Sequence, residues 1–487
     1  MLKPNFDQAE FLKDYWQQKP ILIKNFFSNF EDYTNPEELL EIACINAVDS
    51  RIVTTRPEYC VAERYSLTQG PFDADSPLPA LTEKNWSLLV QSAELWIPDL
   101  QEMIRAFGFL PRWRIEDIMV SLATQGGGVG PHFDQYDVFL VQGLGQRTWC
   151  IGERIDLTAP HTSLPDTASG LNLIDEFEVN QQFIVESGDV LYIPPGYTHW
   201  GISQTPSLCY SVGFRAPSNA EMIESFSNRV MELLTESQRL TDHTTPPMRD
   251  SAEITAKDWQ HAWEVVAGHL ANKGAFLRAF GSLVTEAKSP EFIEPLDDEV
   301  HIEELLAFRG PTVELVRNPA SRLAYAVQAD SDPLLLFVDG ESYELDRICL
   351  PAVRALCADE PENLFDISES GSCVQAPERT LAPVTALIQI TRAGGNELLL
   401  KCVIACHRGK LREFGNDIVR SPKQNTRISF SQHRCVIIGI ACGDHPKVKP
   451  MKSFNALPLG VFLAQFVINN IALLISDQAM AKQGRKV

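Results

Sequence analysis

Short apolar runs that alternate with turn residues dominate the first 217 residues of this chain. Five of these runs are bounded by Gly, Pro or Asp, and they lie at 117–124, 136–143, 181–187, 189–196 and 208–214. Runs of this length with such boundaries are typical of β-strands. A short helix and a strand are predicted ahead of them, over residues 11–27. Many short strands favour a sandwich or a small barrel, so the sequence predicts a mainly β domain over residues 1–217.

Helical spacing replaces the strand pattern after this domain. Ser218 and Glu221 have the spacing of a capping box, the reciprocal pair that starts a helix. Apolar residues then recur on one helical face, at Ile223, Phe226, Val230 and Leu233. A second helical region is predicted over about 257–287, beyond a polar loop that contains prolines. Two amphipathic helices form a module that packs on the rest of the chain, on itself or on a second copy.

Residues 291–395 mix helices with a hairpin of strands, as in a winged-helix unit. Such units often bind DNA, but the charge of the chain argues against that role. The formal net charge is −22, and the segment 396–487 contains 14 Lys and Arg against five Asp and Glu. The other 395 residues therefore carry a charge of −31, which repels nucleic acid and attracts basic proteins, or serves solubility alone.

The segment 396–487 differs in composition from the rest of the chain. It is basic, and its four cysteines have a spacing that fits no zinc motif. Its apolar stretch at 456–476 is long enough to span a bilayer. Pro458, Gly460 and three amide side chains interrupt that stretch, so we expect no membrane association. The sequence leaves the role of this tail open.

The location of the protein is predicted from two further features. The N-terminus lacks the basic head and continuous apolar run of a secretory signal. The 11 cysteines of the chain form no recognisable disulfide framework. Both features predict a protein of the reducing cytoplasm.

His132 and Asp134 stand at the start of a predicted strand, two residues apart. Because side chains alternate between the faces of a strand, both would project from the same face. Two histidines and one carboxylate form the facial triad that holds Fe(II) and leaves positions open. The other histidines of residues 1–217 are His161, in a polar loop with prolines, and His199, which follows a strand and a Pro-Pro-Gly bend. We therefore predict a metal site of His132, Asp134 and His199, with His199 across a barrel from the first two.

Arg147 lies 15 residues after His132, beyond a glycine-containing turn, and is predicted on the neighbouring strand. A guanidinium that points into an apolar barrel needs an anion, because an unpaired buried charge is costly. A dicarboxylate co-substrate would provide one through a bidentate contact. Ser121, on the strand before the glycine-rich loop, could add a hydroxyl to the same carboxylate. The alternative is that Arg147 pairs with a local acid at the surface, and that the histidines are structural.

At these residues the chain resembles the JmjC-type ribosomal oxygenases, in particular the bacterial branch that hydroxylates an arginine of a large-subunit ribosomal protein. The similar segments are long, and they lie at 14–27, 126–143, 188–201 and 210–218. The resemblance implies a JmjC, cupin-like double-stranded β-helix as the catalytic domain over residues 1–217. It also implies a helical dimerisation domain at 218–290 and a winged-helix-like α+β domain at 291–395. The tail at 396–487 has no counterpart in this family.

The resemblance also implies the chemistry of the site. His132, Asp134 and His199 would be the iron ligands, and Arg147 would bind 2-oxoglutarate with assistance from Ser121. The enzyme would use Fe(II), 2-oxoglutarate and O2 to hydroxylate the β-carbon of an arginine in a basic ribosomal protein. We expect it to act as a cytoplasmic homodimer without direct binding of nucleic acid.

Several other functions are compatible with the same residues. A related hydroxylase could act on histidine or asparagine, and a lysine demethylase uses the same oxidant. A non-catalytic cupin-like binding module would have a structural or lost metal site. An isomerase or dioxygenase of small molecules on the same barrel is the remaining alternative. The three ligand residues do not distinguish among the enzymes.

Overall fold

The structure is a computed structural model that describes residues 6–59, 61–73, 78–157, 171, 173–174, 176–241, 252–293, 319–328, 333–345 and 347–357. The tail predicted at 396–487, its apolar stretch at 456–476, His161 and part of the winged-helix-like segment lie outside these residues. Within the described part of the chain, no helix has both the length and the apolar composition needed to cross a bilayer.

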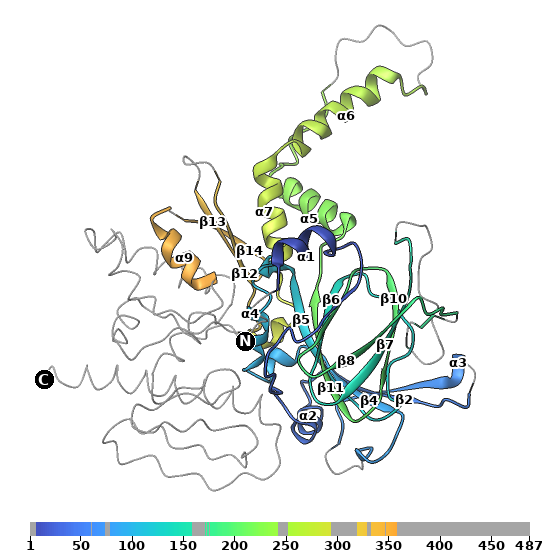
Figure 1. Cartoon of the computed structure of the whole chain (residues 1–487). Helices are drawn as coiled ribbons and strands as arrows, with labels where there is room; N and C mark the ends of the chain where they lie inside the picture. The colour runs from blue at the N-terminus through green and yellow to red at the C-terminus, as the bar shows by residue number, and fades with distance from the viewer. Residues whose placement is uncertain are drawn as a thin grey trace, which may run out of the picture.

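Two antiparallel sheets form the N-terminal domain, and Figure 1 shows them facing each other as in a double-stranded β-helix. The larger sheet has eight strands, which are, in order, β1 (Ile21–Ile23), β9 (Val190–Ile193), β6 (Asp137–Gln142), β11 (Ser207–Phe214), β5 (Ile115–Ala123), β4 (Trp86–Val90), β2 (Ser50–Thr55) and β3 (Tyr65–Gln69). The smaller sheet consists of β10 (Tyr197–Ser203), β7 (Gln146–Arg154) and β8 (Gln181–Glu186). All five predicted strands are confirmed.

Strand β6 is buried along its whole length because it has an apolar layer on each side. Val138 and Leu140 face the smaller sheet and pack with Trp149. Phe139 and Val141 face the opposite side and join the main core. This alternation follows from the two-residue period of a strand, and it explains a run that is apolar without interruption.

Helices cover the outer face of the larger sheet and close the main core. The elements that contribute buried side chains to this core include α1 (Gln8–Asp14), α2 (Pro36–Ile42), η1 (Ala93–Leu95) and α4 (Leu100–Arg105). Two further short elements of this domain are α3 (Val61–Arg64) and η2 (Arg112–Arg114). The predicted helix and strand of residues 11–27 correspond to α1 and β1. A continuous layer of aromatic and aliphatic side chains therefore packs against the outer face of the larger sheet, whose strands contribute to the site described below.

Three helices follow the β domain: α5 (Asn219–Glu232), α6 (Ala256–Leu270) and α7 (Lys273–Val284). The predicted capping box at the start of α5 is confirmed. The prediction of one helical region over 257–287 is wrong in its continuity, because Asn272 caps a new helix by accepting a hydrogen bond from the backbone N–H of Ala275. Helices α5 and α7 pack together through Phe226 and Phe276, whose ring centroids are 5.3 Å apart.

A third sheet follows, with strands β12 (Leu323–Ala326), β13 (Leu334–Val338) and β14 (Glu341–Leu345). The predicted hairpin is confirmed by β13 and β14, and the short helices η3 (Pro290–Phe292), η4 (Arg347–Cys349) and α9 (Leu350–Cys357) flank the sheet in sequence. Gly281 of α7 packs on the ring of Phe337, which lies 2.2 Å from the position that a Cβ would take. This close approach joins α7 and the third sheet into one helical and winged module.

Candidate active site

The backbone brings the predicted ligands together by pairing two segments that are distant in sequence. His132 and His199 form an isolated β-bridge, in which His132 N–H donates to His199 O at 3.0 Å and His199 N–H donates to His132 O at 2.7 Å. The backbone N–H of Gly196 donates to Asp134 O at 2.8 Å. Two details of the prediction are wrong: strand β6 begins only at Asp137, and His199 lies directly beside His132 instead of across the barrel.

The side chains of His132, Asp134 and His199 converge. Their potential ligand atoms all lie within 4.8 Å of one another, and His199 Nε2 is 3.6 Å from Asp134 Oδ2. Each histidine uses Nδ1 at 2.9 Å from a backbone carbonyl, that of Gly130 for His132 and that of Tyr197 for His199. Because a carbonyl only accepts, each Nδ1 carries the proton and each Nε2 offers its lone pair to the centre.

The protonation of His199 suits metal binding. This side chain is 2% exposed, and its burial together with the neighbouring His132 lowers its pKa from 6.5 to about 4. The imidazole is therefore neutral at physiological pH and available as a ligand. Two neutral imidazoles and one carboxylate fit a divalent transition metal such as Fe(II) and leave open coordination positions.

A cavity of about 320 Å³ opens beside these three residues, and Arg147 and Ser121 line it too. Arg147 is 6% exposed. It donates from Nη1 to Ser121 Oγ at 2.8 Å and from Nε to Ser207 Oγ at 2.8 Å. Among the described residues, its hydrogen bonds end on these two serines and on no carboxylate. Burial lowers the pKa of the guanidinium, so an anion brought into the cavity would be strongly attracted.

The position of Arg147 corrects the prediction of a neighbouring strand. Strand β7 pairs with β8 and β10 and not with β6, because the chain crosses to the smaller sheet in the turn 142–146. Gly145 permits this crossing: its φ is +74°, and a Cβ there would lie 2.1 Å from the carbonyl oxygen of Pro206. Arg147 and Ser121 therefore meet across the barrel, from opposite sheets.

One candidate functional residue, Asp117, was not predicted from the sequence. Asp117 is 6% exposed and lines the same cavity, together with Met119 and Ser121 from alternate positions of β5. The two-residue period was visible in the sequence, since Ser121 was expected to face the site and Asp117 lies four residues before it. Within the described lining, Asp117 and Asp134 are the acidic residues.

A second buried carboxyl lies behind Asp117. Glu94 is 8% exposed and accepts a hydrogen bond from the backbone N–H of Ile118 at 2.8 Å. Burial and the nearby Asp117 raise its pKa from 4.5 to about 8. At neutral pH the folded protein therefore keeps a proton on Glu94 that the unfolded chain releases.

This proton makes the stability of the fold depend on pH. Because the pKa of Glu94 is raised in the folded state, its proton binding contributes to the free energy of unfolding. This contribution is fully present below about pH 4.5, and it is lost as the pH rises from there through 8. We predict that the unfolding free energy falls between pH 5 and pH 8 by on the order of 3 kcal/mol more than in Glu94→Gln. Urea unfolding at several pH values measures this difference. The exposed Glu264→Gln on α6 is the control, and equal slopes for wild type and Glu94→Gln would contradict the assignment.

Comparison with known proteins places these features in a family. A JmjC domain model matches residues 102–222, and a ROXA-like winged helix model matches residues 268–374. The chain is 35% identical over 366 residues to the ribosomal protein uL16 3-hydroxylase of Escherichia coli strain K12, covering 74% of this chain and 92% of that protein. It is 29% identical over 381 residues to a probable ribosomal oxygenase of Haemophilus influenzae, covering 76% and 91%.

Solved structures give the same result. The structure of YcfD, a ribosomal oxygenase from Escherichia coli in complex with cobalt and 2-oxoglutarate, superposes with a TM-score of 0.66. The identity is 29%, and the match covers 80% of this chain and 98% of that one. A second structure of the same protein, with cobalt and succinic acid, matches equally well. With a JmjC domain, a winged-helix module and relatives matched over nearly their full length, this chain belongs to the JmjC-type ribosomal oxygenases.

Proposed function

We propose that this protein is an Fe(II)- and 2-oxoglutarate-dependent oxygenase that hydroxylates the β-carbon of an arginine in a large-subunit ribosomal protein. The observation that carries the proposal is one cavity of about 320 Å³ that joins the cluster of two histidines and a carboxylate to the buried Arg147. The uL16 3-hydroxylase of Escherichia coli and the structure with cobalt and 2-oxoglutarate support the reaction and the cofactors.

His132, Asp134 and His199 would hold the iron through Nε2, a carboxylate oxygen and Nε2. When bound, Fe(II) supplies the activation of O2 that couples oxidation of 2-oxoglutarate to succinate and CO2 with hydroxylation of the substrate. The carbonyls of Gly130 and Tyr197 fix both imidazole rings in the tautomer that ligation requires. The chain thus contributes a ligand set in which His199 is buried and His132 and Asp134 are half-buried.

Arg147 would bind the carboxylate of 2-oxoglutarate that lies far from the metal. Its contacts to Ser121 and Ser207 hold the guanidinium in place before the ligand arrives, which lowers the entropy cost of binding. The hydroxyl of Ser121 accepts from Arg147 Nη1 and donates to Cys209 O at 3.3 Å, so Ser121 would orient Arg147. Ser121 would assist with the same carboxylate by turning its hydrogen from Cys209 O to the ligand. The buried charge makes this end of the cavity selective for an anion.

The substrate arginine would enter along the wall that contains Asp117. A buried carboxylate is a suitable partner for a guanidinium, because a charge-assisted hydrogen bond is about twice as strong as a neutral one. The acidic body of the chain, with a charge of −31 outside the segment 396–487, would attract a basic ribosomal protein and repel nucleic acid. We place the reaction in the cytoplasm, where ribosomal proteins meet ribosomes.

The proposed reaction is tested by measuring succinate release from 2-oxoglutarate in the presence of Fe(II) and O2. Addition of uL16 is expected to stimulate release, and the peptide around its target arginine is expected to gain one oxygen atom. Replacement of that arginine by lysine in the peptide should abolish the gain. Stimulation by a methylated lysine peptide with release of formaldehyde would instead favour demethylation. Absence of succinate release under all these conditions would favour a binding module.

We also propose that the protein is a homodimer formed through its helical module. Helix α6 has no buried residue, and four of its large apolar side chains lie on one face, at Trp259, Trp263, Val266 and Leu270. Trp263 is 62% exposed and Trp259 is 55% exposed. In Figure 1, α6 projects from the rest of the described chain, and no other labelled element lies along its length. A second copy of this surface would bury these side chains.

We predict that Trp263→Glu converts the dimer to a monomer. Burying a charge in an apolar interface without a partner costs several kcal/mol, so the dissociation constant should rise by at least about a hundredfold. Size-exclusion chromatography with light scattering measures the mass across micromolar concentrations. Lys257→Glu, on the opposite face of α6, is the control and should remain dimeric. A wild-type protein that is monomeric at these concentrations would contradict the proposal.

A further inference from the structure

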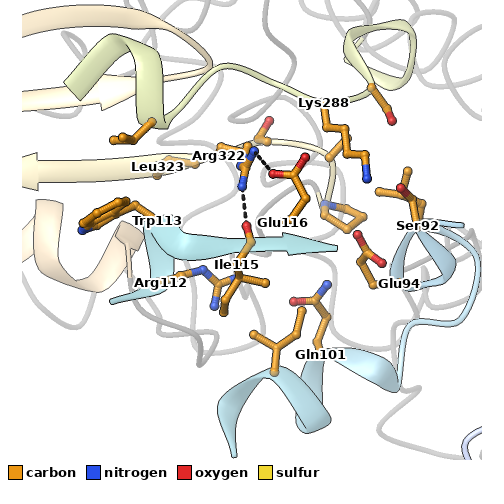
Figure 2. Close-up of a pocket in the computed structure, with 17 residues that line it drawn as sticks. Ser92, Glu94, Gln101, Arg112, Trp113, Ile115, Glu116, Lys288, Arg322 and Leu323 are labelled. Carbon is orange, nitrogen blue, oxygen red and sulfur yellow. Dashed lines mark hydrogen bonds and ion pairs between the residues drawn. The ribbon is translucent and has the colours of Figure 1, made fainter. Parts of the chain in front are cut away.

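A lysine from the helical and winged module reaches a wall residue of the catalytic cavity. Lys288, in the segment after α7, places its Nζ 2.8 Å from Asp117 Oδ2. The two residues are 171 positions apart in sequence. Asp117 is buried and lines the cavity that contains the metal ligands, whereas Lys288 lines a separate pocket of about 70 Å³ behind β5. Figure 2 shows Lys288 and Glu94 on the same side of that pocket.

The hydrogen bonds to Asp117 orient its carboxylate. Gln91 Nε2, the backbone N–H of Ser92 at 3.2 Å and Lys288 Nζ all donate to the same oxygen, Oδ2. The other oxygen, Oδ1, lies on the side of Gly213, at 3.6 Å from the position that a Cβ would take there. Gly213 also lines the catalytic cavity. Three donors therefore hold Oδ2, of which Gln91 also lines the catalytic cavity, and Oδ1 lies toward Gly213 in the lining of the same cavity.

A second cation of the module holds the same end of β5. Arg322, just before β12, pairs with Glu116 at 3.5 Å and donates to the backbone carbonyl of Ile115, as Figure 2 shows. Lys288 and Arg322 therefore attach three consecutive residues, 115–117, to the module. Glu94 lies beside this contact, and its burial and the neighbouring Asp117 raise the pKa of its carboxyl.

We propose that Lys288 is a positioning residue for substrate recognition: it fixes Asp117 by Oδ2, so that Oδ1 receives the guanidinium of the substrate arginine. Docking of the helical and winged module would then be part of the substrate site, and the β domain alone would recognise arginine poorly. The inference rests on the proposed arginine hydroxylation. A positioning role of Lys288 differs from a merely stabilising role in one respect: loss of Lys288 would raise the KM for the peptide and leave the metal and 2-oxoglutarate sites intact.

The experiment compares Lys288→Met, Lys288→Arg and Asp117→Asn in the full chain, with a uL16 peptide as substrate. Lys288→Met is expected to raise the peptide KM about tenfold, the size of one charge-assisted hydrogen bond, with kcat and the KM for 2-oxoglutarate within about twofold of wild type. Lys288→Arg should restore most of the loss. In the Asp117→Asn background, Lys288→Met should have almost no further effect, since the two residues act as one unit. Lys273→Met, on the exposed start of α7, is the matched control.

Each alternative outcome has a defined meaning. An unchanged peptide KM in Lys288→Met, or additive effects in the double variant, would overturn the positioning role of Lys288. Hydroxylation of the peptide by the wild type would still support the proposed function in that case. No hydroxylation by the wild type would overturn the proposed function and this inference with it. If Lys288→Met does not fold, Lys288→Gln retains a donor without the charge, and the same comparison of KM applies to it.

Discussion

Replacement of Asp134 by alanine is expected to eliminate turnover of 2-oxoglutarate. The change removes the one anionic group of the cluster and leaves two neutral imidazoles, which hold a divalent cation weakly. Removal of a group that merely supports a ligand costs up to about a hundredfold in affinity. We therefore expect the dissociation constant for Co(II) or Mn(II) to rise by more than about a hundredfold. Calorimetric titration with these ions and the succinate assay measure both effects.

The fold should survive this substitution, because Asp134 lies at the cavity and is held by its backbone contact to Gly196. Gln135→Ala is the matched control, since this neighbouring side chain is exposed and does not line the cavity. Equal metal affinity in Asp134→Ala and in Gln135→Ala would show that the carboxylate is not a ligand. A loss of affinity in both variants would point to a change in the loop.

Arg147→Met is expected to weaken the binding of 2-oxoglutarate and to leave the stability of the unliganded protein almost unchanged. Truncation of a buried partner in a charge pair costs about 2 to 5 kcal/mol of binding, so the affinity for 2-oxoglutarate should fall at least about thirtyfold. The unliganded protein should lose little stability, because replacing a buried, desolvated charge by an apolar side chain of similar size is often neutral. Ser207 Oγ keeps its contact with Ser203 Oγ at 2.6 Å.

Thermal unfolding with and without 2-oxoglutarate, in the presence of Mn(II), measures both quantities for Arg147→Met. The wild type should be stabilised by the ligand, and the variant should not respond at the same concentration. Arg154→Met, at the exposed end of the same strand, is the control and should respond like the wild type. A ligand response in Arg147→Met equal to that of the wild type would remove Arg147 from the site.

Local patterns in the sequence were sufficient to predict much of the β domain. The strands around residues 117–214 and the cap at Ser218 depend on side-chain periodicity and on one short hydrogen-bonded motif. The grouping of His132, Asp134 and His199 could be predicted because His132 and Asp134 precede β6, His199 lies in β10, and the turns next to them have distinctive residues. The roles of these residues as ligands remain a prediction.

Contacts between distant segments could not be predicted. No local pattern indicates that the turn 142–146 crosses from one sheet to the other. The strand predicted to lie next to that of Arg147 was therefore wrong. The break at Asn272 depends on a capping bond that competes with helix continuation within a few residues. The contact between Lys288 and Asp117 joins positions in different domains, and no local pattern marks it.

The most direct test of the central claim is mass spectrometry of ribosomal proteins incubated with this protein, Fe(II), 2-oxoglutarate and O2, with His132→Ala in parallel. We expect one arginine-containing peptide of uL16 to gain a single oxygen atom, located by fragmentation on the arginine β-carbon. The variant should leave that peptide unmodified. A wild-type protein that releases succinate but modifies a residue other than arginine would contradict the assigned substrate, and a His132→Ala variant with full activity would contradict the assigned metal site.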